Sequence, residues 1–269
     1  MADILRAVFL GIVQGLTEFL PVSSSAHLNI MPWLFKWDNI SDSFDLALHA
    51  GTLLAILIFF YKDWLALIKG GYKTAVKKQK STDGRLFWLI VFATVPAGVS
   101  GLLLEKLVDK AVGGNMNVEM LVISLALIIM GILLYIVDKK CKSTVSYKKM
   151  PAKSAILIGT SQALAAAVPG VSRSGITMTV SRACGLDRES AAKYSFLLSA
   201  PIVAAAVLVK IREFTLSIPF FVGITASFIS GILVIKFLMN FLKKGSYKVF
   251  AIYRVILGIV IFAIALTRM

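Results

Sequence analysis

The sequence predicts an all-α polytopic membrane protein made of two inverted-topology repeats, each with one re-entrant helical hairpin and three transmembrane helices. Three observations predict this class. Of the 269 residues, 58% are hydrophobic and the mean hydropathy is +0.84, as is typical of membrane proteins. Polar residues and a proline interrupt two of the apolar segments. The two interruptions resemble each other at a separation of 148 residues, which indicates an internal repeat.

The first interruption contains the only acidic residue that lies inside a long apolar run, Glu18. Ionisable groups at membrane depth are costly and are kept mainly where they act. Gln14 lies four residues earlier, so both side chains leave one face of a helix. Pro21 then ends that helix, and serines at 23–25 can cap the next one. A broken helix at this depth leaves backbone N–H and C=O groups that need hydrogen-bond partners from protein or water. We therefore expect a re-entrant hairpin with a polar tip.

The second interruption repeats the first with one informative change. In this alignment Arg173 takes the place of Ser25, and the second copy has no counterpart of Glu18 or of His27. One copy therefore supplies an acid and an imidazole, and the other supplies a permanent cation. The matched positions are Gly11 with Gly159, Gln14 with Gln162, Leu16 with Leu164, Pro21 with Pro169 and Ser24 with Ser172.

The chain is expected to form one integral membrane domain over residues 1–269, with a first repeat over 1–137, a basic linker over 138–151 and a second repeat over 152–269. Each span is close to the ~20 residues that a bilayer core requires. The expected elements are hairpin arms 3–20 and 28–35, spans 46–62, 85–104 and 118–137, hairpin arms 152–168 and 174–185, and spans 190–210, 217–239 and 248–267.

The distribution of positive charge predicts the orientation. A net charge of +15 is compatible with nucleic-acid binding, but Lys and Arg are grouped in short loops between apolar runs, so no nucleic-acid partner is expected. One side carries 20 of the 29 basic residues and the other carries 7, with Arg173 and Arg254 inside apolar segments. The positive side is expected to be cytoplasmic, which places both termini outside. The basic loops are 62–85, 138–153, 182–193 and 236–248.

The residues at the two tips suit phosphoryl transfer. Arg173 can bind phosphate through a planar fork, and the loop around it supplies small residues, hydroxyls and a helix N-terminus that favours anions. Glu18, assisted by Gln14, can hold a divalent cation, Mg²⁺ or Ca²⁺, together with substrate phosphates. The other candidates for substrate binding are Ser23, Ser25, Gly170, Ser172, Ser174 and Thr177.

Two mechanisms stay open. In the first, Ser24 attacks phosphorus and His27, three residues later, serves as its base or as the acid for the leaving group. In the second, an activated water attacks and Ser24 only holds the phosphate.

Simpler interpretations compete with both mechanisms. Glu18 and Arg173 can form a purely structural ion pair, and single serines can be helix caps alone. His49, one turn after Asp45, favours a structural hydrogen bond. Arg254 is expected to extend its side chain towards the cytoplasmic membrane surface.

These residues resemble the undecaprenyl pyrophosphate phosphatase family, also called the bacitracin-resistance protein family, over essentially the whole chain. The resemblance depends on four segments and a shorter fifth. Position 14 is Gln where many members have Glu, and Ser25-Ala26 stands where Thr-Gly is usual. The segments are Gln14-Gly-Leu-Thr-Glu-Phe-Leu-Pro-Val-Ser-Ser-Ser-Ala-His27, Ala47-Leu-His-Ala-Gly-Thr-Leu53, Ala93-Thr-Val-Pro-Ala-Gly98, Pro169-Gly-Val-Ser-Arg-Ser-Gly-Ile-Thr177 and Ser195-Phe-Leu-Leu-Ser199.

The resemblance implies an enzyme that removes the terminal phosphate of undecaprenyl pyrophosphate with a divalent cation, recycling the lipid carrier of cell-wall synthesis and conferring bacitracin resistance. It implies catalytic or substrate-binding roles for Glu18, His27 and Arg173, with Ser24 among the supporting residues. The expected setting is the bacterial cytoplasmic membrane, with a site opening to the outer side and a long-chain prenyl pyrophosphate as partner; a homodimer is left open. The alternative is a transporter or flippase of a prenyl-phosphate lipid, because inverted repeats around a midplane site are typical of transporters.

Overall fold

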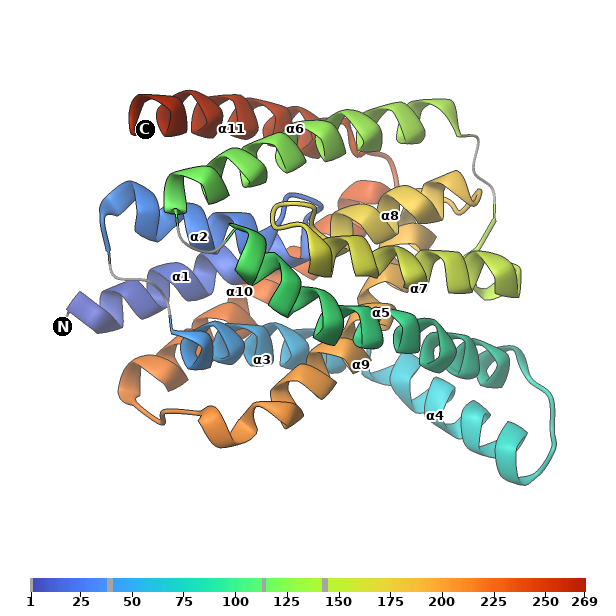
Figure 1. The fold of residues 1–269 in the computed structure, drawn as a ribbon. Coiled ribbons are helices and arrows are strands. Elements are labelled where there is room, and N and C mark those ends of the chain that lie inside the picture. Colours follow the sequence, from blue (N-terminus) through green and yellow to red (C-terminus); the bar gives the residue numbers. More distant parts are fainter. Residues whose placement is uncertain (1, 38–40, 113–114, 142–144) are drawn as a thin grey trace.

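The structure is a computed structural model that describes residues 2–37, 41–112, 115–141 and 145–269, apart from the side chains of residue 2 and residues 101–112. Helices dominate these ranges (Figure 1). They are α1 (Ala2–Phe19), α2 (Ser24–Phe35), α3 (Asp42–Phe59), α4 (Tyr61–Val76), α5 (Thr82–Val112), α6 (Met116–Lys140), α7 (Ala152–Ala167), α8 (Arg173–Ala183), α9 (Arg188–Val209), α10 (Ile218–Leu242) and α11 (Lys248–Thr267), with short 3₁₀ turns at Tyr147–Lys149 and Ile211–Glu213.

The membrane class is confirmed by length and composition. Among the described residues, five helices are long and apolar enough to cross a membrane: α3, α6, α9, α10 and α11. The expected span 85–104 falls within α5, where the side chains from residue 101 onwards lie outside the described part of the chain. The protein is therefore a multi-pass helical membrane protein.

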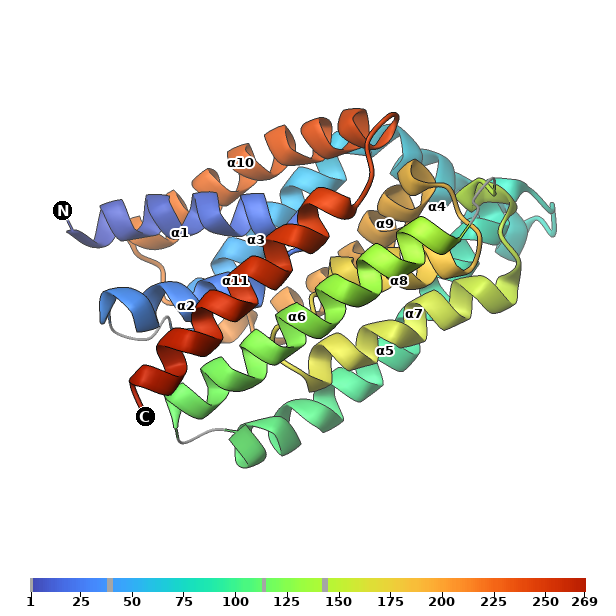
Figure 2. The same ribbon diagram turned by 90° about the horizontal axis from the view of Figure 1, so that it is seen from above.

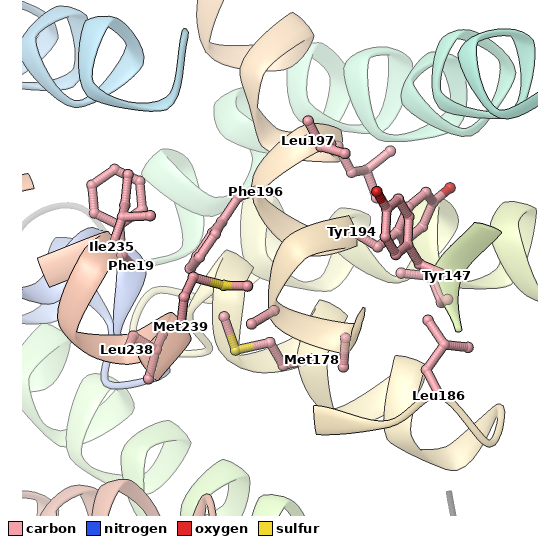
Figure 3. Close-up of a cluster of buried hydrophobic side chains, with 14 of the residues drawn as sticks. Phe19, Tyr147, Met178, Leu186, Tyr194, Phe196, Leu197, Ile235, Leu238 and Met239 are labelled. Atoms are coloured by element: carbon pink, nitrogen blue, oxygen red, sulfur yellow. The ribbon is translucent and has the colours of Figure 1, made fainter. Parts of the chain in front are cut away.

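The helices pack in long pairs, and α9 contacts α3, α5, α8 and α10. α1 lies along α10, α6 along α11, and α5 along α7 (Figures 1 and 2). The largest apolar cluster gathers on buried residues of α9, with side chains from α1, α8 and α10 (Figure 3). In it the ring of Phe19 meets the ring of Phe196 edge to face, with centroids 5.3 Å apart. This contact fixes the end of α1, where Glu18 lies.

The two predicted helix breaks are confirmed. α1 ends at Phe19 and α7 ends at Ala167, each close before a proline. α2 begins at Ser24, four residues before the expected returning arm 28–35, because the preceding serine caps it. The two turns meet near the centre of the molecule (Figure 1), where Ser174 Oγ donates a hydrogen bond to the carbonyl oxygen of Leu20 over 3.1 Å.

The prediction of a basic loop over 62–85 is wrong. Most of it is the helix α4, which packs against the start of α5. Gly70 and Gly71 are buried in this contact, and a Cβ on Gly71 would come within 2.3 Å of the Phe87 ring. The glycines let two helices approach closely in a stretch whose lysine content suggested an irregular loop.

A buried carboxylate ties four helix ends together at the opposite end of the molecule from the termini. Asp138 accepts hydrogen bonds from Nε of Arg182 over 2.9 Å and from Nε of Arg188 over 2.8 Å. It also accepts one from the backbone N–H of Tyr247 over 3.1 Å. The end of α6 is thereby joined to the end of α8 and to the starts of α9 and α11.

Candidate active site

Glu18 lies at the centre of the candidate site, one residue before the end of α1, with 8% of its side chain exposed. Its Oε2 accepts a hydrogen bond from Ser24 Oγ over 2.6 Å, and its Oε1 accepts one from Arg173 Nη2 over 2.9 Å. The side-chain amide of Gln14 also donates to Oε2, over 3.2 Å. The structure therefore joins the predicted acid, one predicted serine and the predicted cation across the two turns.

Both turns contain a serine in an uncommon backbone conformation. Ser23 has a φ of 76° and Ser172 a φ of 72°, in the left-handed region that residues with a Cβ seldom occupy. Each serine caps the following helix, since Ser23 Oγ accepts from the N–H of Ala26 and Ser172 Oγ accepts from the N–H of Gly175. The same strained cap at both tips is a feature that functional sites often carry.

The hydroxyl groups at the two tips are arranged alike. Ser23 Oγ lies 3.3 Å from Ser25 Oγ, and Ser172 Oγ lies 3.2 Å from Ser174 Oγ. Each pair therefore consists of the capping serine and the serine two residues later. These pairs show which residues of the two turns are equivalent.

The equivalence corrects the predicted alignment by one residue. Once the capping serines are matched, the separation is 149 residues, and Arg173 corresponds to Ser24 and not to Ser25. Ser24 and Arg173 are each the first residue of a helix, and both donate to Glu18. The second turn contains one more residue, Gly170, with a φ of 91°. A Cβ there would come within 2.8 Å of the α6 backbone.

Arg254 on α11 joins the two turns through hydrogen bonds to their backbone carbonyl oxygens. The expectation that it extends to the membrane surface is wrong, because its side chain is 0% exposed. Nη1 donates to the carbonyl oxygen of Pro21 over 3.1 Å, and Nη2 donates to those of Gly170 and Val171, both over 3.0 Å. A Cβ on Gly175 would lie 2.6 Å from Nη1, so the small residue there makes room for the guanidinium. Burial of the guanidinium is tolerated because these three carbonyl oxygens accept its hydrogen bonds.

His49 is a member of the site as well as a structural group. Its Nδ1 lies 3.0 Å from the carbonyl oxygen of Asp45, the hydrogen bond that the sequence suggested. With the Nδ1 proton donated there, Nε2 faces Glu18 Oε2 at 3.7 Å, an arrangement that is favourable when Nε2 carries a proton. At this distance the two groups can form an ion pair when His49 is protonated, but not a hydrogen bond.

His27 does not pair with Ser24, contrary to the expected contact between neighbours three residues apart. Its Nδ1 lies 2.7 Å from the carbonyl oxygen of Ser23, and its Nε2 lies 2.7 Å from the hydroxyl of Tyr253. A carbonyl can only accept, so Nδ1 donates and Nε2 accepts from the phenol in the neutral tautomer. The two rings also stack, at an angle of 6°. His27 thus joins the start of α2 to α11.

Thr177 lies within the site's supporting structure. Its hydroxyl lies 2.8 Å from the carbonyl oxygen of Arg173 and 2.6 Å from Ser195 Oγ on α9. The side chain is buried. These contacts hold the first turn of α8, and with it Arg173, against the core.

Two buried amide oxygens at the tips stay unpaired. Gln14 Oε1 and Gln162 Oε1 are both buried and have no hydrogen-bond partner. Gln14 is bound to Glu18 through its nitrogen, so its oxygen is left as a free ligand atom beside the carboxylate. No group of three or more His, Cys, Asp and Glu side chains in the described ranges could hold a metal ion alone. A cation here would need substrate oxygens to complete its ligands, as Mg²⁺ often does.

A polar cavity of about 290 Å³ is lined by residues of α2 and of the first turns of α3 and α6. These parts of the three helices lie on the side of the molecule that carries both termini (Figures 1 and 2). Ser25 and His49 line its inner part, and Asn29, Asp45 and Glu119 are among its other polar residues. Glu18 itself does not line the cavity, which comes closest to the site at Ser25 and His49.

A larger cavity, of about 650 Å³, is an apolar groove between α1 and α10. It is lined by Leu16, which projects about 200° around α1 from Glu18 at 100° per residue. The groove is therefore on the other side of α1 and is not the site of the chemistry.

The sequence analysis placed three contributors outside the site: it gave His49 and Arg254 other roles and did not consider Tyr253. Arg254 carried a usable signal, since a charged residue in an apolar helix normally has a buried partner or task. His49 and Tyr253 carried weak signals, because their partners lie 31 and 226 residues away in the chain. Such distances are bridged only by the packed fold.

A family model described as bacitracin resistance protein BacA matches residues 7–260 of the chain. The undecaprenyl-diphosphatase of Caldicellulosiruptor bescii is 46% identical over 268 residues, which cover 98% of both chains. The undecaprenyl-diphosphatases of Pelotomaculum thermopropionicum and Desulforudis audaxviator are 42% and 44% identical, again with 98% of each chain covered. The chain therefore belongs to the bacitracin resistance protein family.

Proposed function

We infer that this protein is an undecaprenyl-diphosphatase, which hydrolyses undecaprenyl diphosphate to undecaprenyl phosphate and inorganic phosphate within the membrane. The observation that carries the inference is the triad of Glu18, Ser24 and Arg173, formed where the first turns of α2 and α8 meet. The full-length match to undecaprenyl-diphosphatases supports the same activity. In a bacterium this reaction regenerates the lipid carrier of cell-wall synthesis and confers bacitracin resistance.

The diphosphate is bound between the two helix N-termini. Backbone N–H groups and the helix dipoles of α2 and α8 both favour an anion at this place. Arg173 supplies a permanent positive charge. Its side chain is 23% exposed, so a ligand can reach it. Arg254 adds a second buried positive charge beneath both turns. The hydroxyl of Ser25 is placed to donate to a phosphate oxygen, whereas the hydroxyl of Ser174 donates to the carbonyl oxygen of Leu20 and supports the turn.

In the mechanism that we favour, Ser24 Oγ attacks the terminal phosphorus. Its proton passes to Glu18 Oε2, to which the hydroxyl already donates over 2.6 Å. The bond from phosphorus to the bridging oxygen breaks, and undecaprenyl phosphate leaves with the electron pair. Water then cleaves the phosphoserine, giving inorganic phosphate and free Ser24. His49 can store the proton of Glu18 between the two steps.

The water mechanism uses the same residues differently. Glu18 takes a proton from a water molecule that enters through the polar cavity, and this water attacks phosphorus directly. Ser24 then only donates a hydrogen bond to the phosphate. The short contact between Ser24 and Glu18 supports the covalent alternative, in which the pair acts as nucleophile and base.

A divalent cation, Mg²⁺ or Ca²⁺, fits the donor set beside Glu18. The carboxylate and the unpaired Gln14 Oε1 would hold it together with phosphate oxygens of the substrate. When bound, it would neutralise charge on the diphosphate. Asp42, Asp45 and Glu119 line the polar cavity, so a diphosphate that arrives with its cation should meet less repulsion there than a free diphosphate.

The two broken helices also support a specific membrane arrangement. The helix pairs α1–α2 and α7–α8 are the re-entrant hairpins, and the chain consists of two inverted repeats that share one site at mid-depth. The matching caps at Ser23 and Ser172 support this arrangement. The charge distribution supports a location in the bacterial cytoplasmic membrane. It also supports an orientation in which the termini and the polar cavity face the outer side.

Cysteine labelling tests the orientation. In a variant without Cys141 and Cys184, single cysteines at Lys36 and Met269 should react with an impermeant reagent added to intact cells. Cysteines at Lys77 and Lys148 should be protected until the membrane is opened. Equal labelling of all four positions would contradict the inverted arrangement.

Phosphate release tests the activity. The purified protein in lipid vesicles should release inorganic phosphate from undecaprenyl diphosphate, and a chelator should stop the release. The runner-up, a flippase, predicts movement of the lipid across the vesicle without phosphate release, and that outcome would overturn the proposed reaction.

A further inference from the structure

The helix α4 carries a surface that the phosphatase activity does not use. It lies at the end of the molecule opposite both termini (Figure 1), and it is not one of the five helices, among those described, that could cross a membrane. Its inner side is fixed against α5: Leu67, Gly70 and Gly71 are buried, and a Cβ on Gly70 would lie 2.6 Å from the backbone nitrogen of Gly84. This close contact sets which side of α4 faces outwards.

The outward side begins with a row of large apolar side chains. Each is between 51% and 61% exposed, and spacings of four, three, four and four residues place them on one face of the helix. The row is Tyr61, Leu65, Ile68, Tyr72 and Val76. An exposed apolar row on a helix too polar to span a membrane is typical of a helix that lies in the membrane–water interface.

A row of lysines runs beside the apolar row. Lys62, Lys69 and Lys73 each follow a member of that row by one residue, so they lie about 100° around the helix from it, and all three are exposed. Lys77, Lys78 and Lys80 continue the positive charge beyond the end of the helix.

The acidic residues of this region do not neutralise the lysine row. Asp63 is bound by Lys193 Nζ over 2.7 Å, from α9. Asp83 is bound by Lys148 Nζ over 3.0 Å, from the linker. The lysine row therefore presents uncompensated positive charge next to apolar side chains.

We propose that α4 is an interfacial anchor that binds anionic phospholipid. Its apolar row contacts the acyl chains, and Lys62, Lys69 and Lys73 bind the phosphate groups of lipids such as phosphatidylglycerol. The combination selects a lipid surface over an acidic soluble protein, because a soluble partner would satisfy the charge and leave a row of five apolar side chains at its edge. The proposal does not depend on the phosphatase activity.

Lipid titration of the full-length protein in detergent, followed by native mass spectrometry, tests the proposal. The wild type should bind phosphatidylglycerol more tightly than phosphatidylcholine. A basic residue near an anionic surface is worth about fivefold in affinity. The triple variant Lys62→Gln, Lys69→Gln, Lys73→Gln should therefore lose at least tenfold in phosphatidylglycerol affinity and keep its phosphatidylcholine affinity.

A matched control removes the same number of positive charges at another place on the protein. Lys243 and Lys244 follow α10 and Lys248 begins α11; all three are exposed, and their triple change to Gln should reduce phosphatidylglycerol affinity clearly less than the α4 change does. The proposal is overturned if the α4 variant binds phosphatidylglycerol like the wild type, or if the control loses as much affinity as the α4 variant.

Spin labels test where the apolar row lies. In vesicles with phosphatidylglycerol, a nitroxide at Tyr72→Cys should collide more often with oxygen than with a water-soluble nickel chelate. A nitroxide at Ala75→Cys, on the same helix at the edge of the apolar row, provides the position with which the collision rates at position 72 are compared. If the label at position 72 collides mainly with the nickel chelate, α4 is in water, and the anchor is excluded in favour of a soluble partner.

Discussion

Two buried carboxylates, Glu18 and Asp138, each lie between two basic side chains, and the difference between their surroundings separates a catalytic role from a structural one. The partners of Asp138 belong to the chain's own framework: Arg182 is also bound to three backbone carbonyls, and the backbone N–H of Tyr247 points at the carboxylate. The partners of Glu18 are the side chains of Arg173 and His49, which are 23% and 18% exposed. Arg188 beside Asp138 is 33% exposed, so the contrast lies in the backbone groups around Asp138 and not in the exposure of the partners.

The surroundings of Glu18 also leave more room for a ligand than those of Asp138. The polar cavity reaches His49, and an unpaired amide oxygen lies beside Glu18 on Gln14. A structural ion pair is stable when every lone pair and proton is satisfied from within. The cluster around Glu18 has open positions that a diphosphate and a cation would fill. This contrast argues against the purely structural interpretation of the pair of Glu18 and Arg173.

The largest effect is expected at Ser24. If Ser24 is the nucleophile, Ser24→Ala should reduce phosphate release to background, because water does not occupy the place of the missing oxygen at comparable reactivity. Ser25→Ala is the matched control, and it should retain turnover within about tenfold, since one hydrogen bond to a phosphate is worth up to about 1.5 kcal/mol. Measurable activity in Ser24→Ala would favour the water mechanism.

At Arg173 the expected loss is about 10² to 10³ in rate, which is typical when one placed charge contact to a transition state is removed. Arg173→Lys should show most of this loss, because a point ammonium does not reproduce a bidentate fork. Arg188→Lys, at the Asp138 cluster, should leave turnover per folded molecule unchanged. Steady-state phosphate release in both variants checks this, and equal losses would erase the distinction between the two clusters.

A smaller effect is expected at His49. His49→Gln keeps a polar side chain and removes the proton store beside Glu18, so turnover should fall by about tenfold, below the 10² that a primary acid or base contributes. The loss should appear in kcat and leave KM nearly unchanged. A loss confined to KM would assign His49 to substrate binding.

Much of this arrangement was predictable from the sequence. The membrane class, both breaks at Pro21 and Pro169, and the meeting of Glu18 with Arg173 follow from hydropathy, proline and the internal repeat. The equivalence of Ser24 and Arg173 did not, because the additional residue Gly170 is absorbed by a left-handed turn that a constant separation hides.

Packing decided the remaining features. Arg254 has no acidic residue near it in the sequence, and only the folded turns bring three carbonyl oxygens to its guanidinium. α4 contains enough lysine to suggest a loop, yet Gly70 and Gly71 allow it to form a helix against α5. The pairing of His27 was misjudged because Tyr253, from the far end of the chain, competes successfully with the nearby Ser24 for its ring nitrogen.

The most direct test measures turnover and unfolding side by side in Glu18→Gln and Asp138→Asn. Glu18→Gln should release no phosphate above background and unfold close to the wild type, because the side chain of Arg173 is 23% exposed and water can solvate it. Asp138→Asn should lose about 3–5 kcal/mol of stability, as expected when one partner of a buried ion pair is removed, and keep its turnover per folded molecule. Metal-dependent phosphate release by Glu18→Gln at the wild-type rate would contradict the account and make the pair of Glu18 and Arg173 a structural one.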